Sequence, residues 1–499
     1  MSQLPSSWRE TPIETVTEVV SGGTPSSKHP EYYTEDHKGS IAWVTPADLS
    51  GYKEKYISHG RRSITKSGYD SCSAKLMPKG TVLFSSRAPI GYTVIAANEI
   101  STNQGFKSFV PIVGVNETYL YYYLRSIKHL AESLATGTTF KELSGKVAKT
   151  LPFPLAPFAE QTRIVEKLDE VLAQVDTIKA RLDGIPAILK RFRQSVLAAA
   201  VSGKLTEEWR GKNECQSAAD LVRAISLARE RSYASEIKNG NKETKRLKSK
   251  VDKHAPKLPE ESLPTTWVWT SFMQSMERVV DCHNKTAPYI EDGIPLIRTP
   301  DIRNGKISLS GAMYISQETY DYWSRRCPPA SGDIIFTREA PMGEAGIVPE
   351  NVTLCMGQRM MLLRPLSEYV EPKFVLLNIL SLSFQERMFK SAIGTGVKHL
   401  RVADVESLSY PLAPIQEQKE IVRLVDQYFA FADTIEAQVK KAQARVDKLT
   451  QSILAKAFRG ELVPQDPNDE PADKLLERIA LARKEAEALA KAAKKAAQK

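Results

Sequence analysis

The sequence contains no long apolar run and few cysteines. No stretch of about 18 apolar residues occurs, which argues against a membrane span. Met1 to Glu10 has neither a basic lead nor an apolar core, so we expect no secretory signal, a cytoplasmic location and no membrane partner. The 5 cysteines are scattered without a C-x-x-C pair, so neither a disulfide framework nor a zinc site is predicted.

Catalytic motifs are missing as well. The chain lacks a G-x-x-x-x-G-K-[ST] phosphate loop, a G-x-G-x-x-G fingerprint, a nucleophile elbow and the acidic-aromatic tetrapeptide of adenine methyltransferases. Pro300-Asp301 has no nuclease-type partner downstream and favours a turn. Cys282-His283 has no second pair at metal-ligand spacing. We therefore predict a binding protein with no catalytic residue, no metal and no cofactor in this chain.

The charge balance is basic. Lys and Arg number 69 against 59 Asp and Glu, a formal net charge of +10. Such a balance is compatible with a polyanionic partner such as DNA or RNA, although charge alone does not establish one.

A large internal repeat organises the chain. Leu155-Ala156-Pro157 followed by Glu160-Gln161 recurs as Leu412-Ala413-Pro414 followed by Glu417-Gln418. The same offset extends the match, without a gap, from Gly137-Thr138 and Gly394-Thr395 to Gly203 and Gly460. The protein is therefore interpreted as two copies of one unit, each with a variable front half and a nearly fixed back half.

The fixed halves carry apolar residues at alternating spacings of four and three, which predicts long helices with a heptad seam. The seam of the second copy runs from Ile421 to Ile453, and that of the first from Ile164 to Val196. Gly184 and Pro186 predict a kink or restart in the first helix. We expect the two helices to pair antiparallel. Glu417 to Phe458 would span about 63 Å at 1.5 Å per residue.

The variable halves combine short β-rich runs with helical spacing, which predicts an α+β class. Strands are expected within 81–84, 91–97, 106–111 and 333–337, and helices over 119–134 and 374–389. The Lys-rich segment 236–262 is interpreted as a solvated linker. The predicted domains are 1–153 and 263–410 for the variable halves, 154–210 and 411–465 for the helical regions, 211–262 for a short helix and basic linker, and 466–499 for a basic C-terminal helix or tail.

This organisation resembles the specificity subunits of Type I restriction-modification systems over essentially the whole chain. Besides the repeated Leu-Ala-Pro…Glu-Gln motif, the resemblance rests on the stretches Leu83 to Gly91, Ser101 to Phe106, Ala198 to Lys204 and Ala455 to Leu462.

The resemblance implies two mixed α/β target-recognition domains joined by two long antiparallel coiled-coil helices, in a duplicated, pseudo-two-fold arrangement. Each domain would read one half of a bipartite, asymmetric site in double-stranded DNA. The helices would set the spacer and dock two methyltransferase subunits that use S-adenosylmethionine. Restriction/translocase subunits would also join the complex and would require ATP and Mg²⁺. The role of the whole complex would be phage defence.

Base-reading residues can be nominated because Arg, Gln and Asn pair well with guanine and adenine edges. Thr138, Lys141, Thr395 and Lys398 repeat identically, which fits phosphate positioning or packing better than base reading. The DNA-binding candidates are Ser86, Arg87, Asn103, Gln104, Lys107, Thr138, Lys141, Arg338, Glu339, Gln358, Arg359, Thr395 and Lys398.

Two alternatives remain at this stage. One is a single-chain DNA methyltransferase or nuclease, which would need a cofactor pocket that the sequence does not display. The other is a coiled-coil scaffold that joins two partners without DNA. Neither the target sequence nor its spacer length can be read from these residues.

Overall fold

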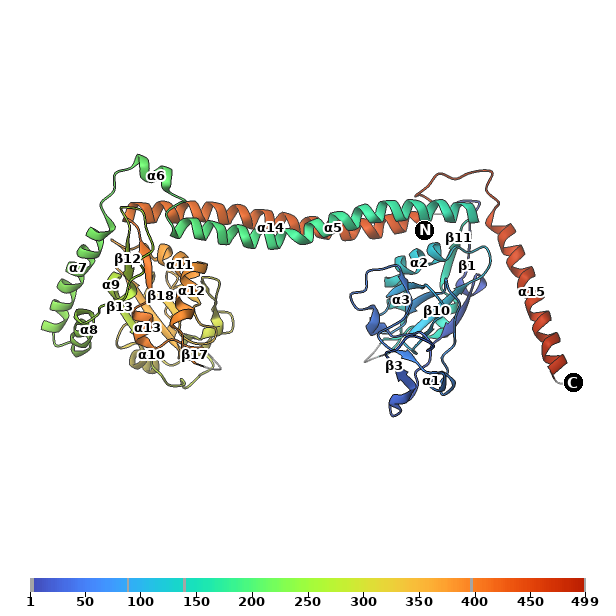
Figure 1. Cartoon of the computed structure of the whole chain (residues 1–499), viewed down its shortest axis with the longest axis horizontal. Helices are drawn as coiled ribbons and strands as arrows, with labels where there is room; N and C mark the ends of the chain where they lie inside the picture. Colours follow the sequence, from blue (N-terminus) through green and yellow to red (C-terminus); the bar gives the residue numbers. More distant parts are fainter. Residues whose placement is uncertain (1–3, 88, 138–140, 395–397, 498–499) are drawn as a thin grey trace. The chain divides into compact units, whose positions relative to one another are not determined.

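A computed structural model describes residues 4–87, 89–137, 141–394 and 398–497, with side chains up to residue 485. The chain forms two compact units (Figure 1). Unit 1 comprises Met1–Asp183 and Lys440–Lys499, and unit 2 comprises Gly184–Val439. Each unit contains one predicted variable half (1–153 or 263–410) together with part of each long helix. We call residues 4–157 head 1 and residues 263–414 head 2, so that each head includes the few residues that lead into its long helix.

Head 1 is built around a five-stranded sheet of order β2-β10-β7-β8-β5. Its strands and helices are β1 (Arg9–Pro12), η1 (Ile13–Thr15), β2 (Thr17–Ser21), η2 (Pro30–Tyr32), β3 (Tyr33–Thr34), β4 (Trp43–Val44), η3 (Pro46–Leu49), β5 (Tyr56–Ile57), β6 (Ser63–Ile64), α1 (Lys66–Asp70), β7 (Val82–Ser85), β8 (Thr93–Ala96), β9 (Ser101–Thr102), β10 (Phe106–Pro111), α2 (Glu117–Ser126), α3 (Lys128–Leu134), α4 (Gly145–Lys149) and β11 (Pro152–Leu155).

The sheet of head 1 is apolar on both faces. Val82 and Phe84 of β7 face one core with the aromatic residues of α2, whereas Leu83 faces a second core with Phe106. Alternation along a strand sends neighbouring side chains to opposite faces, so a continuous apolar run is what a sheet covered on both sides requires. The first core continues into the long helices through Ile164.

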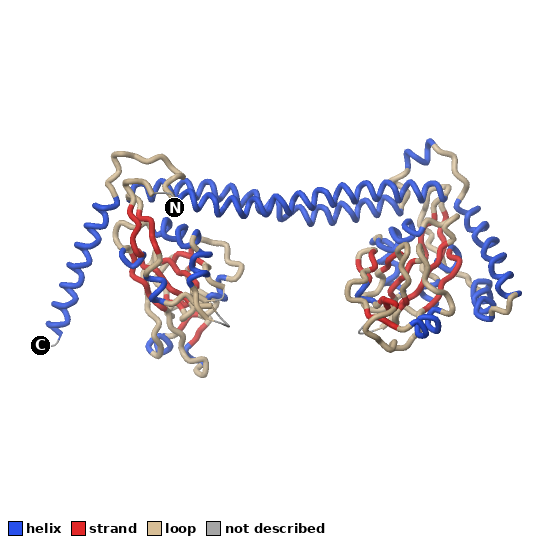
Figure 2. The backbone as a smooth tube through the Cα atoms, turned by 180° about the vertical axis from the view of Figure 1, so that it is seen from behind, coloured by secondary structure: helices blue, strands red, loops and turns tan. Residues whose placement is uncertain are grey.

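Head 2 has a four-stranded sheet of order β13-β21-β18-β19 and a three-stranded sheet of order β17-β14-β20. Its elements are β12 (Val268–Ser271), α9 (Phe272–Ser275), β13 (Met276–Asp281), β14 (Ile294–Ile297), η4 (Thr299–Asp301), β15 (Ile302–Arg303), β16 (Lys306–Ile307), β17 (Met313–Ile315), α10 (Gln317–Ser324), β18 (Ile334–Thr337), β19 (Ala345–Ile347), β20 (Cys355–Met356), β21 (Met360–Pro365), α11 (Pro372–Leu380), α12 (Leu382–Ser391), α13 (Val402–Glu406) and β22 (Ser409–Leu412). Both heads therefore mix strands and helices, as expected (Figure 2).

The expected strands are present, but each predicted head helix is divided. The segment 119–134 falls into α2 and α3, and 374–389 falls into α11 and α12. Ser381 causes the second division, because its buried hydroxyl accepts from the amide of Phe384 and begins a new helix. The spacing of apolar residues does not reveal such a cap, because the cap is a polar side chain.

The fixed halves form α5 (Phe158–Val201) and α14 (Ile415–Ala457). They run antiparallel within each unit: Lys179 pairs with Asp447 at 2.7 Å in unit 1, and Arg193 pairs with Asp433 at 2.6 Å in unit 2. Seam residues near the heads, such as Ile164 and Ile421, are fully buried, whereas others farther along are partly exposed. The buried ends tie the helices to the heads.

Of the kink or restart predicted at Gly184 and Pro186, the restart does not occur, because α5 is one continuous helix, and the kink stays a prediction. Pro186 lies on the exposed side of α5, and Leu189 beyond it is buried. A proline removes one backbone hydrogen bond from a helix. On an exposed face the freed carbonyl can bind water instead, while packing of the other face keeps the helix intact.

The interpretation of 236–262 as a plain linker is also corrected. α7 (Ala218–Lys238) extends into it, and α8 (Lys242–Asp252) follows. Val251 of α8 packs against the core of unit 2, and Lys250 forms a 2.6 Å ion pair with Glu406 of α13. The remaining described helices outside the heads are α6 (Glu207–Lys212) and α15 (Ala472–Ala497), the latter where a C-terminal helix was expected.

Candidate nucleic-acid interface

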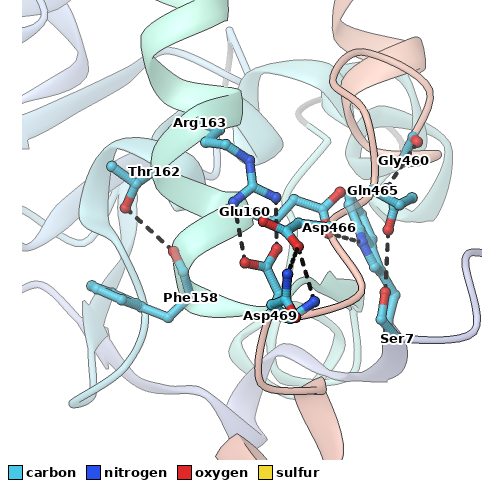
Figure 3. Close-up of polar contacts among 11 residues, drawn as sticks. Ser7, Phe158, Glu160, Thr162, Arg163, Gly460, Gln465, Asp466 and Asp469 are labelled. Carbon is cyan, nitrogen blue, oxygen red and sulfur yellow. Dashed lines mark hydrogen bonds and ion pairs between the residues drawn. The ribbon is translucent and has the colours of Figure 1, made fainter.

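The repeated Glu-Gln motif forms the joint between head 1 and α5. Glu160 is 1% exposed and accepts a 2.8 Å hydrogen bond from the indole Nε1 of Trp8 and another from Gln465 (Figure 3). The Gln161 amide donates to the carbonyl of Ala156 at 2.9 Å and accepts from the amide of Asn116. Arg163, one turn along, forms an ion pair with Asp469 at 2.6 Å. The motif orients the head on its helix.

Unit 2 contains the corresponding joint with one important difference. Trp267 donates to Glu417 at 2.8 Å, as Trp8 does to Glu160. Glu417 also accepts from the Thr206 hydroxyl at 2.7 Å and from the Arg210 guanidinium at 2.6 Å. Glu417 therefore has a cationic partner, whereas Glu160 is bound by neutral donors.

The structure brings the head 1 candidates from three segments together at one end of the sheet, where β7 ends and β10 begins. We call this end, and the matching end of the sheet in head 2, the candidate edge. The Ser86 amide, after β7, donates to the Gly105 carbonyl at 2.7 Å, and the Leu143 amide donates to the Ser86 carbonyl at 2.9 Å. Asn103 and Gln104 lie in the same turn as Gly105, where the Gln104 side chain accepts from Thr24. Segments distant in sequence thus meet at this edge.

Arg87, Lys107 and Glu142 form a charged cluster there. Glu142 binds Arg87 at 2.9 Å and approaches the Lys107 ammonium at 3.6 Å. Lys107 is buried, and desolvation lowers the pKa of its ammonium despite the neighbouring carboxylate. Ser86 is fully buried as well. Both side chains are buried in this structure and present little surface to a base edge, so the nomination of Ser86 and Lys107 as base readers stays a prediction.

We expect Lys107→Met to leave the free energy of unfolding unchanged at pH 7, or to raise it by up to about 2 kcal/mol. Methionine is the natural choice because Met361 occupies the matching position, opposite Phe336 as Lys107 is opposite Phe84. The variant removes a buried cation while Glu142 keeps Arg87.

The pH dependence of the free energy of unfolding checks whether Lys107 is a buried cation with a lowered pKa. Because the folded-state pKa of Lys107 is lowered, its folded state gains stability relative to the unfolded chain as pH rises through that pKa towards the unfolded value of about 10.4. Any advantage of Lys107→Met should therefore shrink with rising pH in denaturant titrations. An advantage that grows instead would contradict it.

The head 2 candidates meet in the same way. The Arg338 amide donates to the Arg359 carbonyl at 2.8 Å, and the Leu400 amide donates to the Arg338 carbonyl at 3.0 Å. Arg338 also binds the Leu400 carbonyl through Nη1 at 2.9 Å, which directs it inward. Glu339 and Arg359 form a 2.9 Å ion pair. The same backbone hydrogen bonds thus present different side chains in the two heads.

Lys141 and Lys398 are exposed beside these edges, whereas Thr138 and Thr395 lie outside the described residues. Head 2 has two further basic residues at this place that the sequence did not indicate. Arg298 and Lys285 line a cleft in head 2 together with Gln358 and Arg359. Pro300-Asp301 proves to be part of the turn η4 beside that cleft, as favoured.

Comparison with known proteins identifies the family. Residues 5–187 and 282–443 match the Type I restriction modification DNA specificity domain. The chain is 35% identical over 394 residues to the EcoBI specificity subunit of Escherichia coli, covering 77% of this chain and 74% of that protein. It is 30% identical to the EcoKI specificity subunit of Escherichia coli K12, covering 100% and 99% respectively.

The chain belongs to the Type I restriction enzyme specificity subunits. Two solved structures share its fold at 18% identity. One is a chain from a structural study of assembly of the type I R-M system, with a TM-score of 0.58, covering 92% of this chain and 100% of that one. The other is the HsdS subunit from Thermoanaerobacter tengcongensis, with a TM-score of 0.53, covering 92% and 98%.

A specificity subunit recognises DNA sequence and is not itself an enzyme. Within the described residues of this specificity subunit, no cluster of three potential metal ligands occurs. No described helix is both long and apolar enough to cross a bilayer.

Proposed function

We propose that head 1 and head 2 each read one half of a bipartite, asymmetric DNA site, and that α5 and α14 form a coiled coil that sets the spacer. The observation that carries this proposal is the matched edge of the two heads. Gly105 and Arg359 occupy equivalent backbone positions, with carbonyls that accept from the amides of Ser86 and Arg338, and only head 2 has an exposed arginine there. A repeated scaffold with different side chains suits two readers of different sequences.

The occurrence of the same joint in both units supports an internal duplication, from which a pseudo-two-fold arrangement would follow. Trp8 with Glu160 and Trp267 with Glu417 make the same 2.8 Å hydrogen bond. We assign recognition to 1–153 and 263–410, the helical regions to 154–210 and 411–465, and accessory segments to 211–262 and 466–499.

The partners follow from this division of roles. We infer that α5 and α14 dock two methyltransferase subunits in the cytoplasm, and that restriction/translocase subunits complete the complex. S-adenosylmethionine, ATP and Mg²⁺ would be bound by those partners. Exposed apolar residues on the long helices, among them Ile188 and Phe431, support a role in docking.

A head exchange tests the proposal. Replacing residues 1–153 with the matching segment of a relative should change one half-site of the methylated consensus and leave the other half-site and the spacer intact. The measurement is the mapping of methylated adenines in DNA from cells expressing the hybrid complex. A change in both half-sites at once would contradict one reader per head.

A further inference from the structure

A cleft of about 260 Å³ opens at the candidate edge of head 2. Three basic residues line it, Lys285, Arg298 and Arg359, and its lining contains no carboxylate. Tyr289, Trp323 and Gln358 complete much of its wall. A concave, cationic surface of this kind favours an anionic or acceptor-rich partner.

The two arginines are held in fixed orientations. Asp301 accepts from Arg298 Nε at 3.3 Å, and the Gly311 carbonyl accepts from Arg298 Nη2 at 3.2 Å. Glu339 accepts from Arg359 Nε at 2.9 Å. The Arg298 and Arg359 side chains remain 40% and 55% exposed. A planar guanidinium held at Nε keeps terminal amino groups for a bidentate acceptor.

Head 1 has matching backbone hydrogen bonds at this place but not the arginines. The Asn103 amide donates to the Val44 carbonyl at 3.0 Å, as the Gly357 amide donates to Ile297 at 2.7 Å. Asp48 caps the amide of Thr45 at 2.7 Å, just as Asp301 caps the amide of Arg298 at 2.8 Å. Thr45 therefore corresponds to Arg298.

Gly105 corresponds in the same way to Arg359, because each carbonyl accepts from the first residue after the adjacent strand. Arg359 has a φ of +68°, in the left-handed region that favours glycine. An arginine in this conformation is strained, and strained residues concentrate at functional sites. The strain and the cleft are independent observations that both indicate a use for this side chain.

We propose that this cleft receives the major-groove edge of a guanine in the half-site read by head 2. Arg359 and Arg298 donate to the guanine O6 and N7 acceptors, and Lys285 neutralises a neighbouring phosphate. This assignment rests on the proposed function and adds the recognised base and the residues that recognise it.

The test uses the full chain assembled with its modification subunits. Arg359→Gly and Arg298→Thr install the head 1 residues. Glycine tolerates the positive φ of position 359, and Thr45 has nearly the same backbone angles as Arg298, with φ of −118° and −113°. Each should lower affinity for the mapped site about 5- to 150-fold. Each should also relax one G·C position in one half-site of the methylated consensus. Arg359→Gly should not lower the thermal unfolding midpoint, because it removes the strain at φ +68°.

Two further variants separate base reading from backbone contact. Lys285→Ala should weaken binding to all sequences alike and reduce the slope of log affinity against log salt by about one. Lys373→Ala, at the start of α11 where Lys373 pairs with Asp426 of α14, is the control and should change neither readout.

Unchanged consensus and affinity in both arginine variants would overturn the proposal. Uniform weakening without relaxed specificity would also overturn it, by assigning the arginines to phosphates. If the wild-type complex shows no bipartite consensus at all, the proposed function fails. If the wild-type consensus is bipartite and only the arginine variants are silent, the guanine assignment alone fails.

Discussion

Inserting four residues into both long helices, after Asp183 in α5 and after Val439 in α14, should lengthen the spacer of the methylated site by one or two base pairs. Four helical residues add about 6 Å, and base pairs lie about 3.4 Å apart along each strand. These points divide the chain into its two compact units, so the joints and both heads are untouched.

Both helices must be extended together, because their polar contacts are in a fixed antiparallel register. Asp183 accepts from Gln443 in unit 1, and Arg193 pairs with Asp433 in unit 2. Extending α14 alone would shift one set of contacts against the other and expose part of the apolar seam.

The wild-type site should be almost lost as a substrate of the extended complex. Displacing one half-site removes two or more base contacts at about 1–3 kcal/mol each, so affinity should fall on the order of 100-fold or more. A matched seven-residue insertion keeps the heptad register and should add about three base pairs. Methylome mapping measures both spacers. An unaltered spacer in a folded, active variant would refute the helices as the ruler.

Glu417→Gln should destabilise unit 2 by about 2–4 kcal/mol, whereas Glu160→Gln should cost less than about 1 kcal/mol in unit 1. Both changes keep an oxygen that can accept from the indole of Trp267 or Trp8. Only Glu417→Gln leaves a guanidinium, that of Arg210, without its charge partner. Arg210 is 19% exposed, which places the cost below that of a fully buried pair.

The joint of unit 1 should also respond to pH. Burial raises the pKa of Glu160 above its usual value, so the wild-type carboxyl stabilises the folded state most below about pH 4.3 and loses that contribution as pH rises through the folded pKa. Glu160→Gln should therefore be relatively less harmful at pH 7 than at pH 4.

Native-state hydrogen exchange of peptides from each unit reports the two effects separately. Glu417→Gln should speed exchange in unit 2, including the first half of α14, and spare head 1. Equal losses of protection in the two variants would show that the Arg210 ion pair does not distinguish the joints.

The sequence predicted the helices and strands in which apolar residues recur at regular, short spacings. Apolar spacing located α14 to within two residues at either end and found β10 with its observed bounds. It failed at α8, because that helix is mostly charged and is held by a few tertiary contacts, among them that of Val251. It also allowed a restart at Pro186 as the alternative to a kink, but packing of the opposite face of α5 keeps the helix continuous.

The candidate site also has some features that the sequence predicted and others that depend on tertiary contacts. Arg359 and Gln358 could be nominated from residue type and turn chemistry. The burial of Ser86 and Lys107 could not be foreseen, because it depends on which segments cover the end of the sheet. Arg298 and Arg359 lie far apart in sequence, and the parallel pairing of β14 with β20 places both on one cleft.

By itself, the sequence determined the family, the repeated architecture and the absence of recognisable catalytic motifs, because motif order and periodicity are properties of the linear chain. Tertiary structure alone decided which side chains face outward at each edge, that Glu417 has Arg210 as a partner while Glu160 does not, and that two arginines share one cleft. These features depend on contacts between distant segments, and no local pattern in the chain encodes them.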